Sequence, residues 1–586
     1  MTDTFTDLYE KSKRGESFDR LYDLITSRDN ILLAFRTIKS NKGSKTKGSD
    51  GKTIDDIKTI KKEEIVDQVQ RILKNYQPKK VRRVFIPKPN GDKRPLGIPN
   101  IMDRIIQQCY KQVLEPIAEA KFYNHSYGFR PNRSTHHAIA RTQFLINNAN
   151  LHYVVDIDIK GFFDNINHTL LIKQLWNMGI RDRQVLKTIS KMLKAEIEGE
   201  GKPTKGTPQG GILSPLLSNI VLNDLDQWIA GQWENFETKH KYTRRNKLRA
   251  IKKSDLKEGY IIRYADDFKI MCRDWKTAEK WYHAVRLYLK DRLKLDISPE
   301  KSQIINLRKR KSEFLGFTIW AERKKKKHVA QTGMIDKKKK DIKEKYKNYI
   351  KRIQNSPTVE NIRLFNSFIL GIHNYFKKAT MVNIEFSRIT HDLSKFTYNR
   401  LKQIGKYEKP KEPHKVYKKF YKNSYRTHKV NGIYLFPIAD VQTSNNLNFS
   451  QDITPFTMEG RNKIHKKLKP DIAYEINKLM LSNIPNRTME YLDNRISRYS
   501  MKNGKCEITG EFLPAEFVHC HHYVPVKLGG KDEFKNLRIL RKEIHTLIHA
   551  TRDNTIQQLI KFLKVTDDQL KKINQYRKVC NLELID

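Results

Sequence analysis

A pair of adjacent carboxylates between two β-rich stretches constrains the fold of this chain most. In the run GYIIRYADDFKIMCR, Asp266 and Asp267 stand between YIIRY and FKIMC, which predicts a hairpin with both acids in its turn. Adjacent like charges in a tight turn repel one another unless a cation lies near them. The alternative is a solvent-exposed Asp pair that only initiates the turn.

A second acidic site follows a strand pattern of the same type. In HYVVDIDIKGFFDNI, the alternation of side chains puts Asp156 and Asp158 on one face of the strand, opposite Val155, Ile157 and Ile159. Two strand ends that both offer carboxylates could hold a pair of Mg²⁺ ions about 3.5–4 Å apart, which activates a 3′-hydroxyl and stabilises a leaving pyrophosphate. The sequence therefore predicts a centre of carboxylates and Mg²⁺.

The charge of the chain points to a polyanionic partner. Its 586 residues include 115 Lys plus Arg against 65 Asp plus Glu, a formal net charge of +50. Such an excess repels itself unless a polyanion neutralises it, and nucleic acid is the usual one. A membrane-surface role would predict one basic amphipathic helix, whereas the basic residues here are spread along the whole chain.

The apolar runs, the cysteines and the length of the chain indicate its cellular compartment and its number of domains. No apolar run approaches the roughly 18 to 20 residues that span a bilayer, and the first residues lack the apolar core of a signal peptide. The 5 cysteines form no C-x-x-C pair and no disulfide framework. We expect a protein of about three to five domains that has no membrane partner and lies in a reducing cytoplasm, most readily a bacterial one, with an organelle as the alternative.

The periodicity changes along the chain. Residues 64–76 have apolar side chains at helical spacing and precede the extended run VRRVFIPKP, so the chain up to about Leu315 reads as mixed α/β. Residues 337–401 read as helical. The basic blocks 324–327, 337–340 and 240–257 fit either nucleic-acid contacts or solvated linkers and helix faces.

Histidines cluster near the end of the chain. His545 and His549 are four residues apart in a helical segment and share one face, while His521 and His522 lie upstream in an extended run. A strand pair and a helix could bring three of these histidines to one cation. The alternatives are a structural zinc site and ordinary core or surface histidines; the zinc site would use Cys506, Cys520, His545 and His549.

Seven motifs occur in an order that resembles the group II intron-encoded reverse transcriptases and maturases. They are VFIPKPNGDKRPLGIPNIMDRIIQQ with FYNHSYGFRPNRSTHHA, DIDIKGFFDNI, GTPQGGILSPLLSNIVLNDLD, YADDF, LDISPEKS and FLGF. The resemblance implies a multidomain α+β protein: a right-hand polymerase with fingers, an antiparallel palm sheet and a helical thumb, followed by a small ββα-metal HNH nuclease domain.

The resemblance also implies roles for individual residues of the polymerase. Asp158, Asp266 and Asp267 would bind two Mg²⁺ ions, with Asp156 in a supporting position. Phe163 would sense the sugar, although a core aromatic beside Phe162 is as consistent with the spacing. Four further residues would contact the incoming dNTP or its pyrophosphate, namely Lys88, Arg94, Gln209 and Lys301. Lys301 would donate a proton to pyrophosphate, or be only an exposed lysine after a turn.

The spacing of the C-terminal histidines resembles the HNH endonucleases. By that resemblance, His522 would be the general base that activates a water molecule, and Asn536 would be the residue that orients it for this role. His521, His545 and His549 hold one divalent ion, for which we expect Mg²⁺. Many family members carry two C-x-x-C pairs here, whereas this chain has Thr509, Arg541 and Ile544 at those places, so we expect no structural zinc.

The resemblance implies four regions: fingers and palm at 1–336, the maturase or thumb region at 337–425, a DNA-binding segment at 426–500 and the nuclease at 501–586. The expected partners are group II intron RNA, target DNA and dNTP, with homodimer formation left open. The expected function is to bind the intron RNA, promote its splicing and support retrohoming, in which the nuclease nicks target DNA and the palm copies the RNA into cDNA from the nick.

Two alternatives belong to other functional classes. A domesticated maturase would keep the RNA surfaces without catalysis, which the intact Asp158, Asp266, Asp267 and His522 disfavour. A host-adapted polymerase, such as a retron-like reverse transcriptase, would have no need of the maturase and nuclease regions.

Overall fold

The chain divides into two units, each built from separate stretches of sequence. The computed structural model describes all residues except 88–92, 422–424, 465–469, 483 and 485–486. The first unit comprises Met1–Lys121, Ile172–Leu216 and Asp452–Asp586, and the second comprises Phe122–Leu171 and Leu217–Gln451.

A four-stranded antiparallel sheet forms the centre of the second unit. Its strands are β3 (Tyr153–Ile157), β4 (Tyr260–Tyr264), β5 (Asp267–Cys272) and β6 (Gln303–Asn306), in the order β4-β5-β3-β6. Val154, Val155 and Ile157 of β3 are buried on both faces of the sheet, which suits β-branched side chains. The sheet therefore has a rigid central strand that ends one residue before Asp158.

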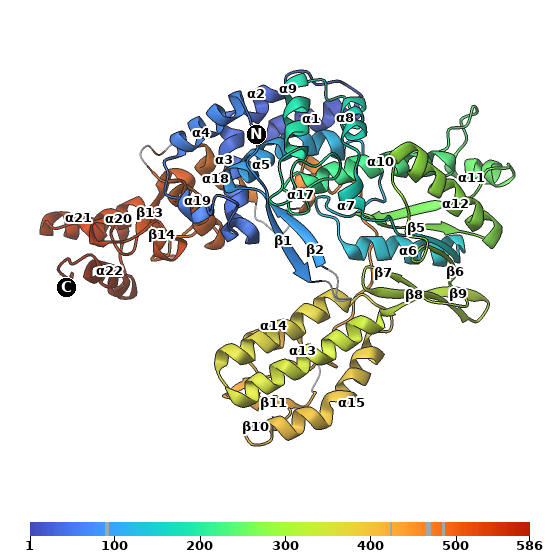
Figure 1. Cartoon of the computed structure of the whole chain (residues 1–586). Coiled ribbons are helices and arrows are strands. Elements are labelled where there is room, and N and C mark those ends of the chain that lie inside the picture. The colour runs from blue at the N-terminus through green and yellow to red at the C-terminus, as the bar shows by residue number, and fades with distance from the viewer. Residues whose placement is uncertain (88–92, 422–424, 465–469, 483, 485–486) are drawn as a thin grey trace. The chain divides into compact units, whose positions relative to one another are not determined.

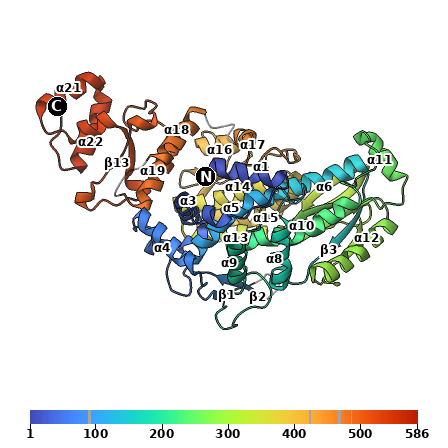
Figure 2. The same cartoon turned by 90° about the horizontal axis from the view of Figure 1, so that it is seen from above.

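Helices pack against this sheet (Figures 1 and 2). The helix α12 (Trp275–Tyr288) contacts β3, β5 and β6, and α6 (Thr135–Ala149) contacts β4. The start of α12 is capped by Asp274, whose carboxylate accepts from the backbone N–H of Thr277 at 2.8 Å. The remaining elements of this region are α7 (Phe162–Asn165), α10 (Ser214–Gln232), α11 (Arg244–Lys252), β7 (Ser312–Phe314), β8 (Phe317–Lys324) and β9 (Lys327–Met334).

Three long helices follow in the second unit and lie side by side in Figure 1. They are α13 (Asp336–Asn355), α14 (Val359–Phe376) and α15 (Val382–Leu401). A small sheet of β10 (Gly405–Glu408), β11 (Thr427–Val430) and β12 (Ile433–Tyr434) comes next. The helix α16 (Lys415–Phe420) follows β10 and precedes β11 in the sequence. The sheet includes residues on both sides of the expected boundary at 425/426, and Asn366 of α14 bonds to the backbone of Tyr434 and Phe436.

The first unit begins with helices and a hairpin. They are α1 (Thr2–Lys13), α2 (Leu21–Ile25), α3 (Arg28–Ser40), α4 (Lys62–Lys74), β1 (Arg82–Pro87), β2 (Lys93–Ile98), α5 (Ile101–Glu119), α8 (His168–Asn177, shared with the second unit) and α9 (Arg183–Leu193). Its C-terminal part contains α17 (Met458–Ile464), α18 (Pro470–Leu481), α19 (Met489–Met501), β13 (Val518–His522), β14 (Leu537–Arg541), α20 (Lys542–His549), α21 (Asp553–Leu563) and α22 (Asp567–Val579).

Several expectations from the sequence are confirmed at this level. The helix expected at 64–76 is α4, residues 82–87 of the run VRRVFIPKP form β1, and the helices α13 to α15 cover the stretch expected to be helical at 337–401. The two β-rich stretches around the paired acids form the antiparallel hairpin β4-β5. The mixed α/β character and the antiparallel sheets agree with the expected fold class. Among the described residues, no helix combines the length and apolarity that crossing a membrane requires.

The basic blocks occupy exposed turns and helix faces. Lys324 to Lys327 form the turn of the β8-β9 hairpin, and Lys337 to Lys340 lie in the first turn of α13. The stretch 240–257 contains the short basic helix α11.

The packing of α13 to α15 leads to a stability prediction. Phe365 of α14 is 1% exposed and meets the Tyr346 ring edge-on at 5.2 Å, so Phe365→Ala should destabilise this bundle by about 3–5 kcal/mol. Leu364, its neighbour in sequence, is 37% exposed, and Leu364→Ala should change stability by less than about 1 kcal/mol. Hydrogen exchange of the α13–α15 amides measures both; equal losses of protection would contradict the packing described here.

Candidate functional site

The paired acids lie at the turn between β4 and β5, but only Asp266 is in the turn itself. The expectation that both acids lie in the turn is wrong for Asp267, because it is the first residue of β5. Tyr264 pairs with Asp267 across the hairpin, which leaves Ala265 and Asp266 between the strands. Ala265 has φ 59°, in the left-handed region that costs a residue with a Cβ roughly 1–2 kcal/mol. The surrounding structure must therefore hold this turn in place.

The electrostatics of the turn favour a bound cation. Asp267 is half-buried, and burial raises its pKa to about 6, with the charges of Asp156, Asp266 and Asp158 adding to the shift. Lys269 acts in the opposite direction without cancelling the shift. A divalent cation beside Asp266 and Asp267 would stabilise the ionised form of these carboxylates over the protonated form. Oxygen donors are the ligands that Mg²⁺ prefers.

Asp158 follows β3 directly and is fixed through its backbone. Its N–H donates to the Ser302 hydroxyl at 3.1 Å, and its C=O accepts from the Ser298 N–H at 2.8 Å. The intervening Lys301 puts its Nζ 3.6 Å from an Asp158 carboxylate oxygen, and both side chains are exposed. The SPEKS motif thus supports the position of Asp158 and places an ammonium group beside its carboxylate.

Asp156 differs from the other acids because it already has a buried cation. The Lys269 ammonium lies 2.6 Å from its carboxylate, and the Lys269 side chain is 1% exposed. This pairing neutralises Asp156 within the protein.

The two neighbouring phenylalanines after β3 have different environments. Phe162 is 2% exposed and belongs to the core, whereas Phe163 is half-buried. The Phe163 ring meets Phe129 edge-on at 6.5 Å, and Phe129 is 50% exposed with φ 58°. Sequence reasoning missed Phe129, although its place in the motif YGFRP was a signal.

The expected nucleotide-binding residues of the fingers belong to the first unit. Lys88 lies outside the described residues, and Arg94 is exposed on β2. The backbone C=O of Gln209 accepts from the Gly97 N–H at 2.8 Å, which joins the TPQGG loop to β2. Gly210 has φ 121°, and a Cβ there would lie 2.6 Å from the Gly97 oxygen, so this contact requires glycine.

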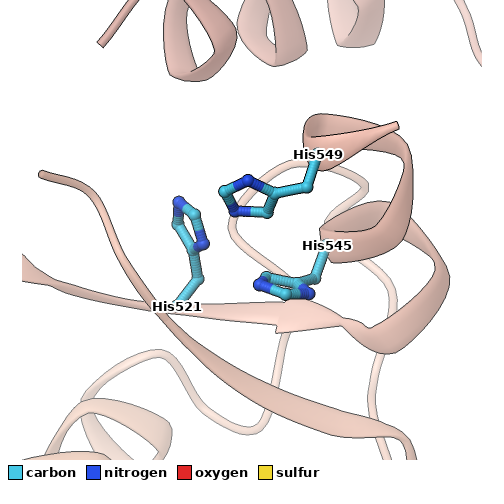
Figure 3. Close-up of side chains that lie close together, drawn as sticks. All are labelled: His521, His545 and His549. Atoms are coloured by element: carbon cyan, nitrogen blue, oxygen red, sulfur yellow. The ribbon is translucent and has the colours of Figure 1, made fainter. Parts of the chain in front are cut away.

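Three of the C-terminal histidines converge (Figure 3). His521 comes from β13, and His545 and His549 come from α20, with one ligand atom of each within 4.8 Å of the others. Burial and the neighbouring histidines lower the pKa of His521 to about 3 and that of His545 to about 4. Their imidazoles are therefore neutral at pH 7 and can donate lone pairs to a metal ion. Three nitrogen donors suit Zn²⁺ or Ni²⁺ better than the Mg²⁺ that we expected from the sequence.

The cysteines of the alternative zinc site lie elsewhere. Cys506 and Cys520 are buried in the apolar core of this region, and burial raises the pKa of Cys520 to about 12. In the part of the chain that the structure describes, neither joins a group of three or more candidate ligands; only His521, His545 and His549 form one. The structure thus gives no support to the alternative in which the two cysteines bind zinc.

His522 makes a separate set of contacts. Its Nε2 lies 2.7 Å from an Asp532 carboxylate oxygen, and its ring stacks on Tyr491 at 5.4 Å. Asn536 bonds through its side-chain amide to the backbone of Val524 and Lys531, which closes the loop after His522. Asp532 was missed by sequence reasoning, although it stands two residues after the Gly-Gly turn.

Arg577 fixes the end of the helix that carries two of the histidines. Its Nη1 donates to the C=O groups of Leu547, Ile548 and Ala550 at 3.1, 3.1 and 2.8 Å, and the residue is 2% exposed. These are carbonyls that the C-terminus of α20 leaves unpaired. The helix α22 is therefore part of the same packed module, which the spacing of the histidines alone did not indicate.

Comparisons with known proteins agree with the fold and the motifs. A family model described as reverse transcriptase (RNA-dependent DNA polymerase) matches residues 86–319. The group II intron-encoded protein LtrA of Lactococcus lactis subsp. cremoris is 32% identical over 462 residues, which cover 67% of this chain and 75% of that protein. Protein YkfC of Escherichia coli (strain K12) is 34% identical over 306 residues, 49% of this chain and 79% of the relative. A putative COX1/OXI3 intron 2 protein of Saccharomyces cerevisiae is 30% identical over 336 residues, 51% of this chain and 39% of the relative.

The histidine cluster predicts a metal site that can be measured by calorimetric titration with Zn²⁺. We expect one tight site per chain, and His545→Ala should weaken it by about 100-fold or more, because loss of a ligand exceeds the 10- to 100-fold effect of losing an outer partner. His391→Ala, which removes an exposed histidine of α15, should leave the affinity unchanged. Equal affinities of the native protein and His545→Ala would show that the cluster is not the site.

Proposed function

Because this chain belongs to the family of group II intron-encoded reverse transcriptases and maturases, we propose that it binds its intron RNA, promotes splicing and supports retrohoming. The family supports reverse transcription and a splicing role, with an RNA template and dNTP as substrates. The observation that carries the catalytic part is the placement of Asp158, Asp266 and Asp267 at the ends of adjacent strands, where burial and the neighbouring carboxylates raise the pKa of Asp267.

In the polymerase, Asp158, Asp266 and Asp267 would hold two Mg²⁺ ions. When bound, these ions lower the pKa of the attacking 3′-hydroxyl and stabilise the charge on the leaving pyrophosphate. The side chain of Lys301 has an ammonium group beside Asp158 that can donate a proton to pyrophosphate. Phe163, supported by Phe129, would lie against the sugar of the incoming nucleotide.

In the fingers, Lys88 and Arg94 would bind the triphosphate of the dNTP, the first through its ammonium charge and the second through its planar guanidinium. Lys88 lies outside the described residues, and Arg94 is exposed on β2. Gln209 would lie along the primer and template, in a loop held to β2 by the backbone of Gly97. The thumb region and the segment 426–500 would bind intron RNA and target DNA, which is consistent with the net charge of +50.

The C-terminal module would act as an HNH endonuclease that nicks target DNA. In this proposal His521, His545 and His549 hold one divalent ion, and His522 removes a proton from the attacking water. The Asp532 carboxylate, 2.7 Å from His522 Nε2, would fix the orientation of that imidazole. Asn536 would act indirectly, since its amide holds the loop that follows His522.

Two alternatives make different predictions. A domesticated maturase would bind and splice RNA without synthesis of DNA, and the acids and His522 would be free to change. A host-adapted polymerase would synthesise DNA without any dependence on an intron. Splicing of an intron RNA that surrounds the reading frame, followed by its copying into DNA, would be expected of the proposed function alone.

The polymerase proposal predicts the effect of removing one carboxylate. Asp158→Asn should lower template-directed DNA synthesis by about 10³-fold or more, because each tenfold corresponds to 1.36 kcal/mol and metal stabilisation contributes several kcal/mol. RNA binding, measured by filter retention, should be unchanged. Asp291→Asn, at an exposed position after α12, should retain full activity. If Asp158→Asn keeps normal synthesis, Asp158 is not a metal ligand of the reaction.

The nuclease proposal predicts a separable loss. His522→Ala should remove nicking of a DNA that contains the insertion site, while DNA synthesis on a primed template persists, because the two sites use different residues. Asp532→Asn should retain part of the nicking activity, since it keeps a hydrogen-bonding partner for His522. Unchanged nicking by His522→Ala, measured on end-labelled DNA, would contradict its role as the base.

A further inference from the structure

A buried arginine lies directly beneath the acidic turn of the second unit. Arg263 of β4 donates from Nε and Nη2 to the Asp226 carboxylate of α10, at distances from 2.6 to 2.9 Å. Its Nη1 donates to the Asn219 side-chain oxygen at 2.9 Å and to the backbone C=O of Ala265 at 2.8 Å. The side chains of Arg263 and Asp226 are 1% and 0% exposed, so water cannot replace these partners.

An ion pair at this depth is a poor source of stability. Removing both charges from water costs several kcal/mol per ion, and a packed apolar pair of similar volume often gives equal or greater stability. An apolar pair could not, however, donate a hydrogen bond to the Ala265 carbonyl. The guanidinium therefore makes one contribution that an apolar pair could not replace, namely the hydrogen bond that holds the backbone of the turn.

The hydrogen bond to Ala265 acts on the backbone that carries the acids. The carbonyl of Ala265 belongs to the peptide group that joins it to Asp266, so a donor there fixes the plane from which Asp266 projects. Ala265 itself has φ 59° and needs such support.

A second segment holds the turn from another side. Arg263 exchanges backbone hydrogen bonds with the segment 125–127, with its N–H donating to His125 and its C=O accepting from Tyr127. The neighbouring Gly128 approaches so closely that a Cβ there would lie 2.2 Å from the Ala265 nitrogen. Asn219 links Gly128 to the Arg263 guanidinium, because its amide N–H donates to the Gly128 C=O at 2.9 Å and its side-chain oxygen accepts from Arg263.

We propose that Arg263 is a positioning residue of the polymerase, held by Asp226 and Asn219, that sets the geometry of the turn that bears Asp266 and leads into Asp267. It touches neither substrate nor metal and acts through the Ala265 carbonyl. The inference rests on the proposed role of the two acids in synthesis. Three motifs meet around Arg263. RYADD contains it, SNIVLNDLD supplies Asn219 and Asp226 to its guanidinium, and YGFRP contacts its backbone and Asn219.

The test separates stability from turn geometry. Arg263→Met and Asp226→Leu each leave one buried charge unpaired, and we expect both single variants to unfold at a clearly lower temperature than the native protein. The double variant Arg263→Met/Asp226→Leu should recover the native unfolding temperature. It should still incorporate nucleotides about 10²-fold more slowly, because displacement of the reacting groups by about 1 Å costs that much. It should also need a higher Mg²⁺ concentration for half-maximal rate.

Two control variants separate a loss of stability from a loss of turn geometry. Ile261→Ala, in the core of the same strand, should lose activity only in proportion to its unfolded fraction. If the double variant recovers activity together with stability, the pair is only structural and the inference is overturned. If Asp266→Asn is also fully active in the same assay, the proposed role of the acids has failed instead.

A second variant decides the matter if the double variant does not fold. Arg263→Lys keeps a positive charge for Asp226, but an ammonium cannot reach Asp226, Asn219 and the Ala265 carbonyl as the fork of a guanidinium does. We expect a folded protein with the same slow incorporation and raised Mg²⁺ requirement. Native incorporation and a native Mg²⁺ requirement in Arg263→Lys would overturn the inference.

Discussion

Like charges must be held together at the ends of β3 and of the β4-β5 hairpin, and several contacts of the second unit meet this constraint. Burial raises the pKa of Asp267, and the charges of Asp156, Asp266 and Asp158 raise it further. The protein relieves the repulsion only in part: Lys269 neutralises Asp156, and Lys301 lies beside Asp158. The carboxylates at the turn retain a strong electrostatic preference for a cation, and a rigid central strand fixes where that cation can bind.

The two candidate metal centres differ in the chemistry of their donor atoms, and this difference favours different ions at the two places. The palm offers carboxylate oxygens in a partly charged environment, which suits Mg²⁺. The C-terminal module offers three neutral imidazoles in a buried environment, which suits a softer ion such as Zn²⁺.

The sequence predicted the local elements near these centres well, because each depends on short-range patterns. The hairpin around Asp266 and Asp267 and the helix carrying His545 and His549 follow from residue alternation and spacing. The long-range contacts were not predictable in this way. Asp226 and Arg263 are 37 positions apart, and Arg577 is 27 to 30 positions from the carbonyls that it contacts at the end of α20, so no local pattern reveals either contact. The choice between Phe162 and Phe163 also needed the fold, because burial distinguishes them and spacing does not.

The most direct test of the central claim is to locate metal ions by anomalous diffraction. Crystals of the full chain with a primer–template and a non-hydrolysable dNTP, soaked in Mn²⁺, should show peaks bound by Asp158 and Asp266 at the ends of β3 and β4. Mn²⁺ prefers oxygen donors and substitutes for Mg²⁺ at such sites. Ordered primer and nucleotide without any peak at these carboxylates would contradict the account of the palm as a metal-dependent polymerase centre.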